Sequence, residues 1–201
     1  MCAAIAASNI FVQYPFEHFG LGEMLTYSAF TYPFAFLVND LTNRRFGPAA
    51  ARKVVYAGFV LGVFISIWLA TPRIAIASGS AFLIAQLMDI TVFNSLRKKT
   101  WWKAPFAAAM FGSIVDTVLF FSIAFAAQFA WLDAMTGLPD SSLTDPASFL
   151  GFGMPLWASL AIGYFFVKVV MVTLMLVPYA AILSAFSPAL FAPYKAPGRI
   201  L

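Results

Sequence analysis

The chain has 201 residues, of which 62% are hydrophobic and only 10% are charged. Soluble globular domains carry about 25% charged residues, so this composition excludes a soluble domain and indicates a protein whose solvent is lipid. The net charge of +4 does not indicate nucleic-acid binding, because the excess basic residues lie in short segments between apolar stretches, where membrane topology and anionic headgroups explain them.

Six apolar stretches are candidates for helices that cross a bilayer, which requires roughly 20 residues each. They cover residues 1–14, 24–40, 53–71, 74–96, 104–132 and 153–186. The first is short, and no secretory signal peptide is expected because Met1–Phe16 contains no basic residue. The last is too long for one straight crossing and predicts a tilt or a kink at Pro178. We predict an all-α membrane protein, a single integral membrane transporter domain over residues 1–201 with six transmembrane helices in a compact bundle.

Ten of the twelve Lys and Arg residues fall in three clusters that define the topology. The clusters are Arg44, Arg45, Arg52 and Lys53; Arg97, Lys98, Lys99 and Lys103; and Lys195 and Arg199. Two expected crossings separate each cluster from the next, so all three lie on one side. Short cytoplasmic loops are enriched in Lys and Arg, and both termini are therefore expected in the cytoplasm. Of the two basic residues outside the clusters, Arg73 is expected in a loop on the opposite side of the membrane. Residues 133–152 are expected to form a longer loop on that same side.

Several kinds of chemistry are not expected. Cys2 is the only cysteine and His18 the only histidine, so a disulfide within the chain, a metal site and a resident cofactor are all disfavoured. The chain contains no Gly-Lys-Ser/Thr ending of a phosphate-binding loop and cannot form a Ser-His-Asp set from a single loop histidine. We therefore expect a protein that is not an enzyme and does not itself hydrolyse ATP.

Two ionisable residues are expected near the middle of the membrane. Counting about 1.5 Å per residue places Asp116 about 18 Å along the fifth crossing and Lys168 about 17 Å along the sixth, starting from opposite faces. A charge at such depth faces a protein interior or an aqueous cavity. Two interpretations stay open: an ion pair that joins the two helices, or groups that contact a solute or a proton. They are compatible if a ligand competes for the pair.

Helical spacing adds further candidates. Gln86, Asp89 and Phe93 share one helical face and present an amide, a carboxylate and a ring together, as a site that reads a heterocycle would. Tyr164 lies one turn before Lys168. At the cytoplasmic rim, Asn39 and Asn43 are four residues apart, as are Asp40 and Arg44. Four residues near this rim are candidates for either a structural or a gating role: Asp40, Asn43, Arg44 and Asn94. Both roles stay open because a charged side chain costs little free energy near the membrane surface.

The same residues resemble the queuosine precursor transporter family, also described as a putative vitamin uptake transporter family. The similarity extends over nearly the whole chain and is carried by short fragments: Tyr32-Pro33-Phe34, Val38 to Arg44, Gln86 with Asp89, Val92-Phe93-Asn94, Trp101-Trp102, Phe111-Gly112-Ser113 with Asp116-Thr117, and Tyr164 to Lys168 with Pro178. Two features differ from the pattern: the lead before the first helix is short, and the residues around Gly163 and Tyr164 lack an acidic side chain.

The resemblance implies uptake of 7-deazaguanine precursors of queuosine, such as 7-cyano-7-deazaguanine, across the bacterial inner membrane for tRNA queuosine salvage. It also implies a bundle like the substrate-binding subunits of energy-coupling-factor vitamin transporters. A guanine-like ring offers an N–H and an amine to a carboxylate and a carbonyl oxygen to a donor. On this basis Asp89 or Asp116 accepts hydrogen bonds from the N–H and the amine of the ring. Lys168 donates to the ring carbonyl oxygen or neutralises a carboxylate. Asn39 and Gln86 supply further polar contacts, and Phe93 or Tyr164 stacks on the ring.

Three alternatives stay open at this stage. The chain is a solitary facilitator or ion-coupled transporter, a binding subunit that requires a separate ATPase module, or a general nucleobase carrier. The sequence leaves open the energy source, the preferred precursor, the carboxylate that reads the base and whether the protein is a homo-oligomer. Its partners are expected to be the small-molecule solute and the lipid bilayer, not nucleic acid.

Overall fold

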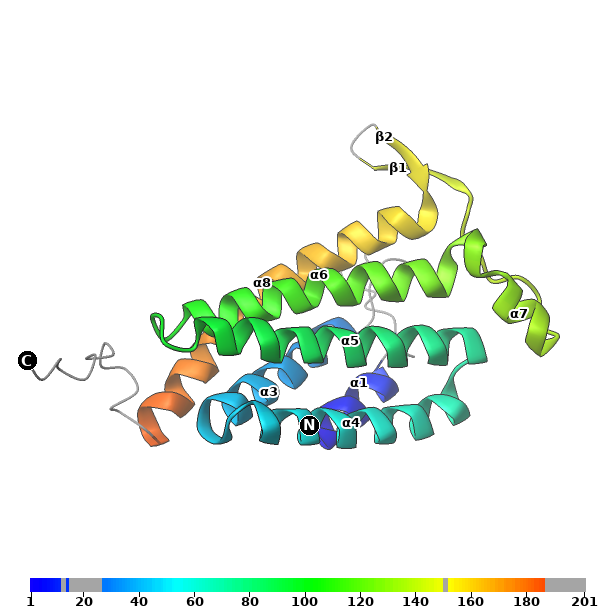
Figure 1. The fold of residues 1–201 in the computed structure, drawn as a ribbon. Helices are drawn as coiled ribbons and strands as arrows, with labels where there is room; N and C mark the ends of the chain where they lie inside the picture. The colour runs from blue at the N-terminus through cyan, green and yellow to red at the C-terminus, as the bar shows by residue number, and fades with distance from the viewer. Residues whose placement is uncertain (12–13, 15–26, 150–151, 187–201) are drawn as a thin grey trace, which may run out of the picture.

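A computed structural model describes residues 1–11, 14, 27–149 and 152–186 of the chain. The helices are α1 (Cys2–Phe11), α2 (Ser28–Thr31), α3 (Pro33–Phe46), α4 (Pro48–Leu69), α5 (Pro72–Leu96), α6 (Lys103–Phe125), η2 (Ala127–Phe129, a 3-10 turn), α7 (Trp131–Thr136) and α8 (Leu156–Phe186). Two short strands, β1 (Pro146–Phe149) and β2 (Phe152–Pro155), form an antiparallel hairpin before α8. The long helices lie side by side, with α5 and α6 adjacent to each other and α7 and the hairpin at one end (Figure 1).

Four helices are long and apolar enough to cross a bilayer: α4, α5, α6 and α8. The shortest of them has 22 residues and spans about 33 Å at 1.5 Å per residue, enough for a hydrocarbon core of about 30 Å. The chain is therefore a multi-pass, predominantly helical membrane protein. Helices α2 and α3 are continuous through Tyr32, which has helical dihedral angles and donates its N–H to the Ser28 carbonyl, so residues 28–46 form one bent helical segment.

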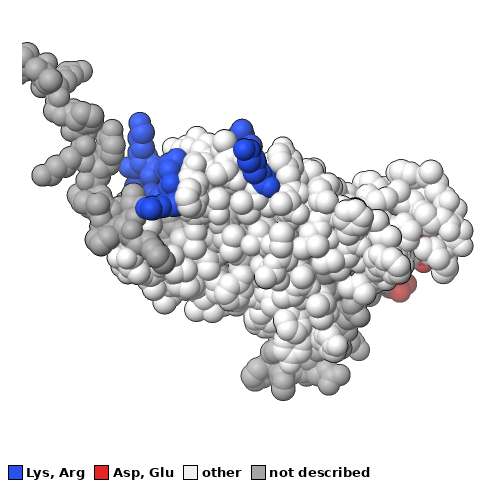
Figure 2. Space-filling model, turned by 90° about the horizontal axis from the view of Figure 1, so that it is seen from below, with Lys and Arg blue, Asp and Glu red and all other residues white. Residues whose placement is uncertain are grey.

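Most of the basic residues lie toward one end of the molecule, which we call the basic end, and Figure 2 shows Lys and Arg side chains in that half of one face. Arg44 and Arg45 end α3, Arg52 lies near the start of α4, and residues 97–103 connect α5 to α6. The turn between α3 and α4 is a single residue, Gly47, whose φ of 86° lies in the left-handed region that other residues avoid. The grouping follows from antiparallel helices, because the α3–α4 and α5–α6 connections must lie at the same end.

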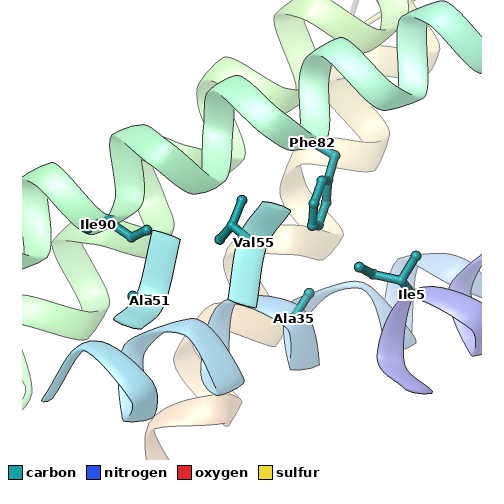
Figure 3. Close-up of a cluster of buried hydrophobic side chains, with 6 residues drawn as sticks. All are labelled: Ile5, Ala35, Ala51, Val55, Phe82 and Ile90. Atoms are coloured by element: carbon teal, nitrogen blue, oxygen red, sulfur yellow. The ribbon is translucent and has the colours of Figure 1, made fainter. Parts of the chain in front are cut away.

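Small residues allow the helices to pack closely. One buried apolar cluster joins four helices and consists of Ile5, Ala35, Ala51, Val55, Phe82 and Ile90 (Figure 3). At the contact between α5 and α6, a Cβ on Gly112 would lie 2.6 Å from the Phe36 ring and 3.3 Å from the Ala85 carbonyl oxygen. Close backbone approach through glycine and alanine is the usual way that membrane helices gain van der Waals contact.

The structure differs from the expected elements in three places. Most of the loop expected at 44–52 is helical, because Gly47 alone reverses the chain and Pro48 begins α4. The stretch expected as a crossing over 104–132 divides at Ala126, whose extended backbone separates α6 from η2 and α7. The hairpin begins in the loop expected at 133–152, and its second strand, β2, takes up the start of the stretch expected as the last crossing, so that α8 begins at Leu156. Pro178 lies inside α8, which continues to Phe186. Two expected features lie outside the described residues: the loop between the first two crossings, at 15–23, and the basic pair Lys195 and Arg199.

Candidate functional site

A cavity of about 300 Å³ lies among α1, α2, α3, α4, α5, α6 and α8. We call it the large cavity. Its wall is mostly apolar and carries eight polar side chains: Ser8, Ser28, Tyr32, Ser66, Ser78, Asp116, Tyr164 and Lys168. Small-molecule sites typically combine a volume of roughly 300–1,000 Å³ with an apolar wall and a few polar groups. The large cavity fits that description at the lower end of the range, which suits a small rigid solute.

An ion pair between α6 and α8 forms part of the cavity wall. Lys168 Nζ donates to Asp116 Oδ2 and also to Thr117 Oγ1 at 3.2 Å. Asp116 Oδ1 accepts a second hydrogen bond from the Tyr32 hydroxyl at 2.7 Å. The Asp116 and Lys168 side chains are 9% and 3% exposed. Each charge therefore has a partner of opposite sign, as a buried ion requires, while both side chains still border the large cavity.

Aromatic rings surround the ammonium group. Lys168 Nζ lies 5.3 Å from the centre of the Tyr32 ring and 5.1 Å from that of Tyr164, within the range of cation–π attraction. The Tyr164 ring packs against Phe121 at 5.7 Å, and its hydroxyl shares a hydrogen bond of 2.8 Å with Ser28. Three predicted site residues, Asp116, Tyr164 and Lys168, are thus brought together on one wall. The ion pair and the open space beside it coexist, so a solute entering the cavity meets both charges.

The other predicted binding residues lie in a separate cluster between α3 and α5. Asn39 Nδ2 donates to Asp89 Oδ2 at 2.9 Å and approaches the Gln86 carbonyl oxygen at 3.3 Å, while Asn43 Nδ2 reaches the Ile90 carbonyl oxygen at 3.3 Å. The side chains of Asn39, Asp40, Asn43, Gln86 and Asp89 are all buried, and we call them the amide–carboxyl cluster. None of them lines the large cavity. Within the described residues, six of their buried atoms have no hydrogen-bond partner: Asn39 Oδ1, Asp40 Oδ1, Asn43 Oδ1, Gln86 Nε2, Gln86 Oε1 and Asp89 Oδ1.

Arg44 lies next to this cluster and holds four elements together. Its guanidinium donates to the Tyr179 hydroxyl at 2.9 Å, the Arg97 carbonyl oxygen at 3.1 Å and the Trp101 carbonyl oxygen at 3.2 Å. It also lies over the Phe93 ring at 5.0 Å. In return, Arg97 Nη2 donates to the carbonyl oxygen of Arg44 at 2.6 Å. Phe93 is completely buried, and its ring faces the Arg44 guanidinium.

The sequence suggested a pair between Asp40 and Arg44, four residues apart on α3. Across the described residues, the ion pairs within 4 Å include no Asp40–Arg44 contact, because Arg44 directs its donors to Tyr179 and to two carbonyl groups instead. Asp40 borders a small cavity of about 20 Å³ between α3, α6 and α8. Asn94, the fourth candidate for a structural or gating role, lies exposed on α5.

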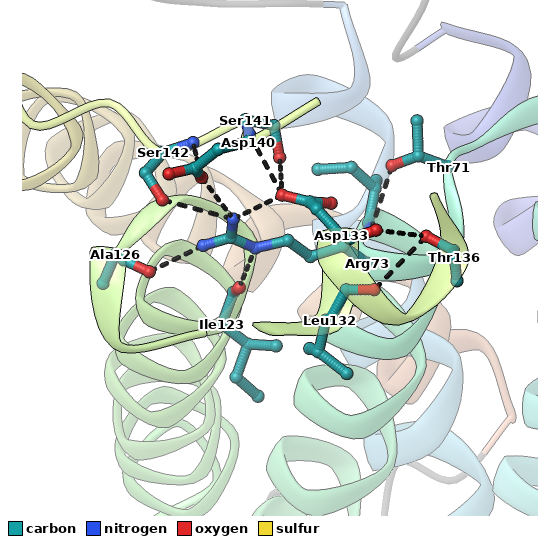
Figure 4. A network of polar contacts seen from close by, with 11 residues as sticks. Thr71, Arg73, Ile123, Ala126, Leu132, Asp133, Thr136, Asp140, Ser141 and Ser142 are labelled. Atoms are coloured by element: carbon teal, nitrogen blue, oxygen red, sulfur yellow. Dashed lines mark hydrogen bonds and ion pairs between the residues drawn. The ribbon is translucent and has the colours of Figure 1, made fainter. Parts of the chain in front are cut away.

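Sequence reasoning missed a polar network at the end opposite the basic end. Arg73 is fully buried, and its guanidinium donates to the carbonyl oxygens of Ile123 and Ala126 at 2.8 and 2.6 Å and to Asp133 Oδ2 at 2.7 Å (Figure 4). Asp140 Oδ1 lies at 3.4 Å from the same Nη1 atom. A signal was present: Arg73 is the one basic residue outside the three basic clusters and the apolar runs, and the loop expected at 133–152 contains acidic residues.

The network changes the ionisation of its carboxyl group. Burial raises the pKa of Asp133, but hydrogen bonds from the Ser141 backbone N–H, from Arg73 and from the Ser141 hydroxyl outweigh burial and hold that pKa below its ordinary value of 3.8. The carboxylate therefore stays charged and joins α5 to α7 and to the segment that follows α7. The network joins the ends of α5 and α6 to α7 and to the segment after α7, at the same end as the hairpin, where it fixes the connection between α6 and α8.

Fold and site together define a multi-pass membrane protein with an internal cavity that has an ion pair in its wall. The sequence profile of the family described as "Putative vitamin uptake transporter" matches residues 26–71 and 63–183. The chain belongs to that family.

Curated relatives carry more specific names. A "Probable queuosine precursor transporter" of Haemophilus influenzae is 42% identical over 152 residues, covering 60% of this chain and 65% of the relative. The "Queuosine precursor transporter" of Escherichia coli is 39% identical over 142 residues, covering 60% and 63%, and a Bacillus subtilis relative is 27% identical. The chain thus spans slightly less than two thirds of the length of each relative. No solved structure matches the chain.

Proposed function

We propose that this protein carries 7-deazaguanine precursors of queuosine, such as 7-cyano-7-deazaguanine, across the bacterial inner membrane. The observation that carries the proposal is the large cavity with the Asp116–Lys168 pair and two tyrosine rings on its wall. The names of the relatives support the choice of solute, because they are called queuosine precursor transporters. Those names also point to transport and away from catalysis.

The proposed topology has six crossings with both termini in the cytoplasm. The basic end then faces the cytoplasm, in agreement with the positive-inside rule. Four of the crossings are α4, α5, α6 and α8, the bent segment of residues 28–46 is a fifth, and α1 contributes to the first. The hairpin and the Arg73 network lie on the periplasmic side. The large cavity reaches Leu69, Ala70 and Ile74 at the α4–α5 turn, so it extends toward that side.

The chemistry of the wall matches a guanine-like ring. A carboxylate accepts two parallel hydrogen bonds from the N–H and amine of the ring, and an ammonium group donates to its carbonyl oxygen. In this structure Asp116 and Lys168 pair with each other, so the solute binds by taking over part of that pairing. Tyr164 and Phe121 supply apolar ring surface for the flat face of the solute. Asn39, Gln86, Asp89 and Phe93 would contact the solute only after it leaves the large cavity toward the cytoplasm.

The test is counterflow of radiolabelled 7-cyano-7-deazaguanine in liposomes that contain only the purified protein. Liposomes preloaded with unlabelled solute should take up label without any ATPase. Tight binding without counterflow would contradict a solitary carrier and favour the binding-subunit alternative. Guanine competing as well as the precursor would contradict the assigned solute class.

A charge swap separates the ion pair from the binding role. Asp116→Asn should abolish counterflow, and the double variant Asp116→Lys with Lys168→Asp should restore the thermal stability that either single reversal loses. Counterflow should stay lost in the double variant, because the carboxylate and the ammonium then face the wrong edges of the solute. Recovered counterflow would show that the pair serves only to join α6 and α8.

A further inference from the structure

The amide–carboxyl cluster contains two buried carboxyl groups from two different helices. Asp40 on α3 is 3% exposed and Asp89 on α5 is fully buried. Asn39, the residue before Asp40, donates its Nδ2 to Asp89 Oδ2 at 2.9 Å, so both carboxyl groups belong to the contact between α3 and α5. One oxygen of each group has no hydrogen-bond partner in the part of the chain that the structure describes.

The cations near this pair are directed elsewhere. Arg44 lies four residues after Asp40, but its donors go to Tyr179, Arg97 and Trp101. Arg97 donates to the Arg44 carbonyl oxygen, and Lys168 is paired with Asp116 at the large cavity. Tyr179 on α8 is the titratable group that faces Asp40 across the small cavity, whereas α6 presents Pro105 and Ala109 there and α4 presents Ala51 and Val55 to the neighbouring core. Within the described residues, no ion pair within 4 Å reaches either carboxyl group.

Two buried carboxyl groups without a cation partner cannot both stay ionised in a dry interior. Burial disfavours the charged form, and a second negative charge on the facing helix disfavours it further, so such a pair holds at least one proton. The Asp116 carboxylate differs, because Lys168 and Tyr32 stabilise its charge. The closed arrangement of α3 against α5 therefore requires a proton, and an arrangement that admits water between them allows it to leave. The small cavity beside Asp40, about 20 Å³, has room for one water molecule.

We propose that Asp40 and Asp89 form a proton-carrying site that couples solute uptake to the proton gradient. This inference rests on the proposed transport function. The pair takes a proton from the periplasmic side while the basic end is closed, as in this structure. When α3 and α5 separate at the basic end, the pair ionises in water and releases that proton to the cytoplasm together with the solute. No covalent bond forms or breaks, and one proton moves inward with each solute.

The experiment compares two modes of transport in the same liposomes. Counterflow of the neutral 7-cyano-7-deazaguanine requires the carrier and no net driving force. Accumulation driven by an acidic exterior requires coupling, and one pH unit supports about tenfold accumulation for one proton per solute. A pH-sensitive dye in the lumen reports whether solute entry brings protons with it. The variant is Asp40→Asn, and the matched control is Asp145→Asn, which removes an exposed carboxylate before the hairpin.

We expect the wild type and the Asp145→Asn variant to accumulate solute about tenfold and to acidify the lumen as solute enters. The Asp40→Asn variant should retain counterflow and lose both accumulation and acidification. Wild-type counterflow without solute-dependent acidification would overturn the proton inference and leave the transport function intact. Absence of wild-type counterflow would overturn the transport function itself.

A second measurement does not depend on the Asp40→Asn variant folding. Hydrophobic carbodiimides react with protonated carboxyl groups inside membranes, so wild-type protein treated at neutral pH should be labelled at Asp40 or Asp89 and not at Asp116. Peptide mass spectrometry locates the label. Labelling at Asp116 with both members of the pair unmodified would contradict the assignment of the proton.

Discussion

Replacing Arg73 by Met removes the cation from a fully buried network while keeping a side chain of similar length. Three strong contacts disappear, to the carbonyl oxygens of Ile123 and Ala126 and to Asp133. The most costly consequence is the Asp133 carboxylate, which is 2% exposed and would be left without its partner. Removing one member of a buried ion pair costs about 3–5 kcal/mol. We therefore expect the free energy of unfolding to fall by that amount.

Denaturant titration in mixed detergent micelles measures this loss. The control is Arg52→Met, which removes an exposed arginine from α4 and should change the free energy of unfolding by less than about 0.5 kcal/mol. A double-mutant cycle with Asp133→Asn isolates the pair, and residues in direct contact show coupling of about 0.5–3 kcal/mol. A loss below about 1 kcal/mol for Arg73→Met, or additive effects in the cycle, would refute the claim that this pair joins α5 to α7.

Two further predictions concern stability. Because the folded protein lowers the pKa of Asp133, its carboxylate stabilises the fold fully above pH 3.8 and loses this effect as the pH falls through the folded-state pKa. The thermal midpoint, measured between about pH 5 and about pH 2, should therefore fall less steeply in Asp133→Asn than in the wild type, and equal slopes would contradict this. Gly112→Ala should cost about 1–3 kcal/mol, because its Cβ would lie 2.6 Å from the Phe36 ring. Gly153→Ala, whose Cβ would meet nothing within 4 Å, is the control in the same thermal assay, and equal midpoints for the two variants would refute the packing argument.

Much of the helical arrangement follows from charge and apolarity along the chain. The clusters at Arg44 and at Arg97 predicted which connections share an end, and the structure places both at the basic end. Counting residues from the two faces predicted that Asp116 and Lys168 meet at a similar depth, and they are in contact. The count succeeds because the fixed rise per residue largely defines how deep a side chain lies along a crossing helix.

Other features depend on how helices are rotated against one another, which periodicity does not define. Gln86 and Asp89 share a helical face, as predicted, but that face meets α3 through Asn39 and not the large cavity. Gly58 and Gly62 line the large cavity, and a Cβ on Gly58 would lie 2.5 Å from Ile5. Neither role was predicted, because a glycine in the sequence does not show which neighbour its helix face meets. The role of Arg73 was missed because its partners come from a loop about 60 residues away, with no periodicity to connect them.

The reciprocal contacts of Arg44 and Arg97 have a mechanical consequence. Each guanidinium binds the main-chain oxygen of the other residue, so the two bonds join the ends of α3 and α5 in opposite directions. Sliding one helix along the other would strain both bonds together, and breaking either bond leaves a charged group beside an apolar core. Rearrangement at this end should therefore occur in a single cooperative step, with few partly opened states, and its rate should depend on how readily water replaces these two bonds.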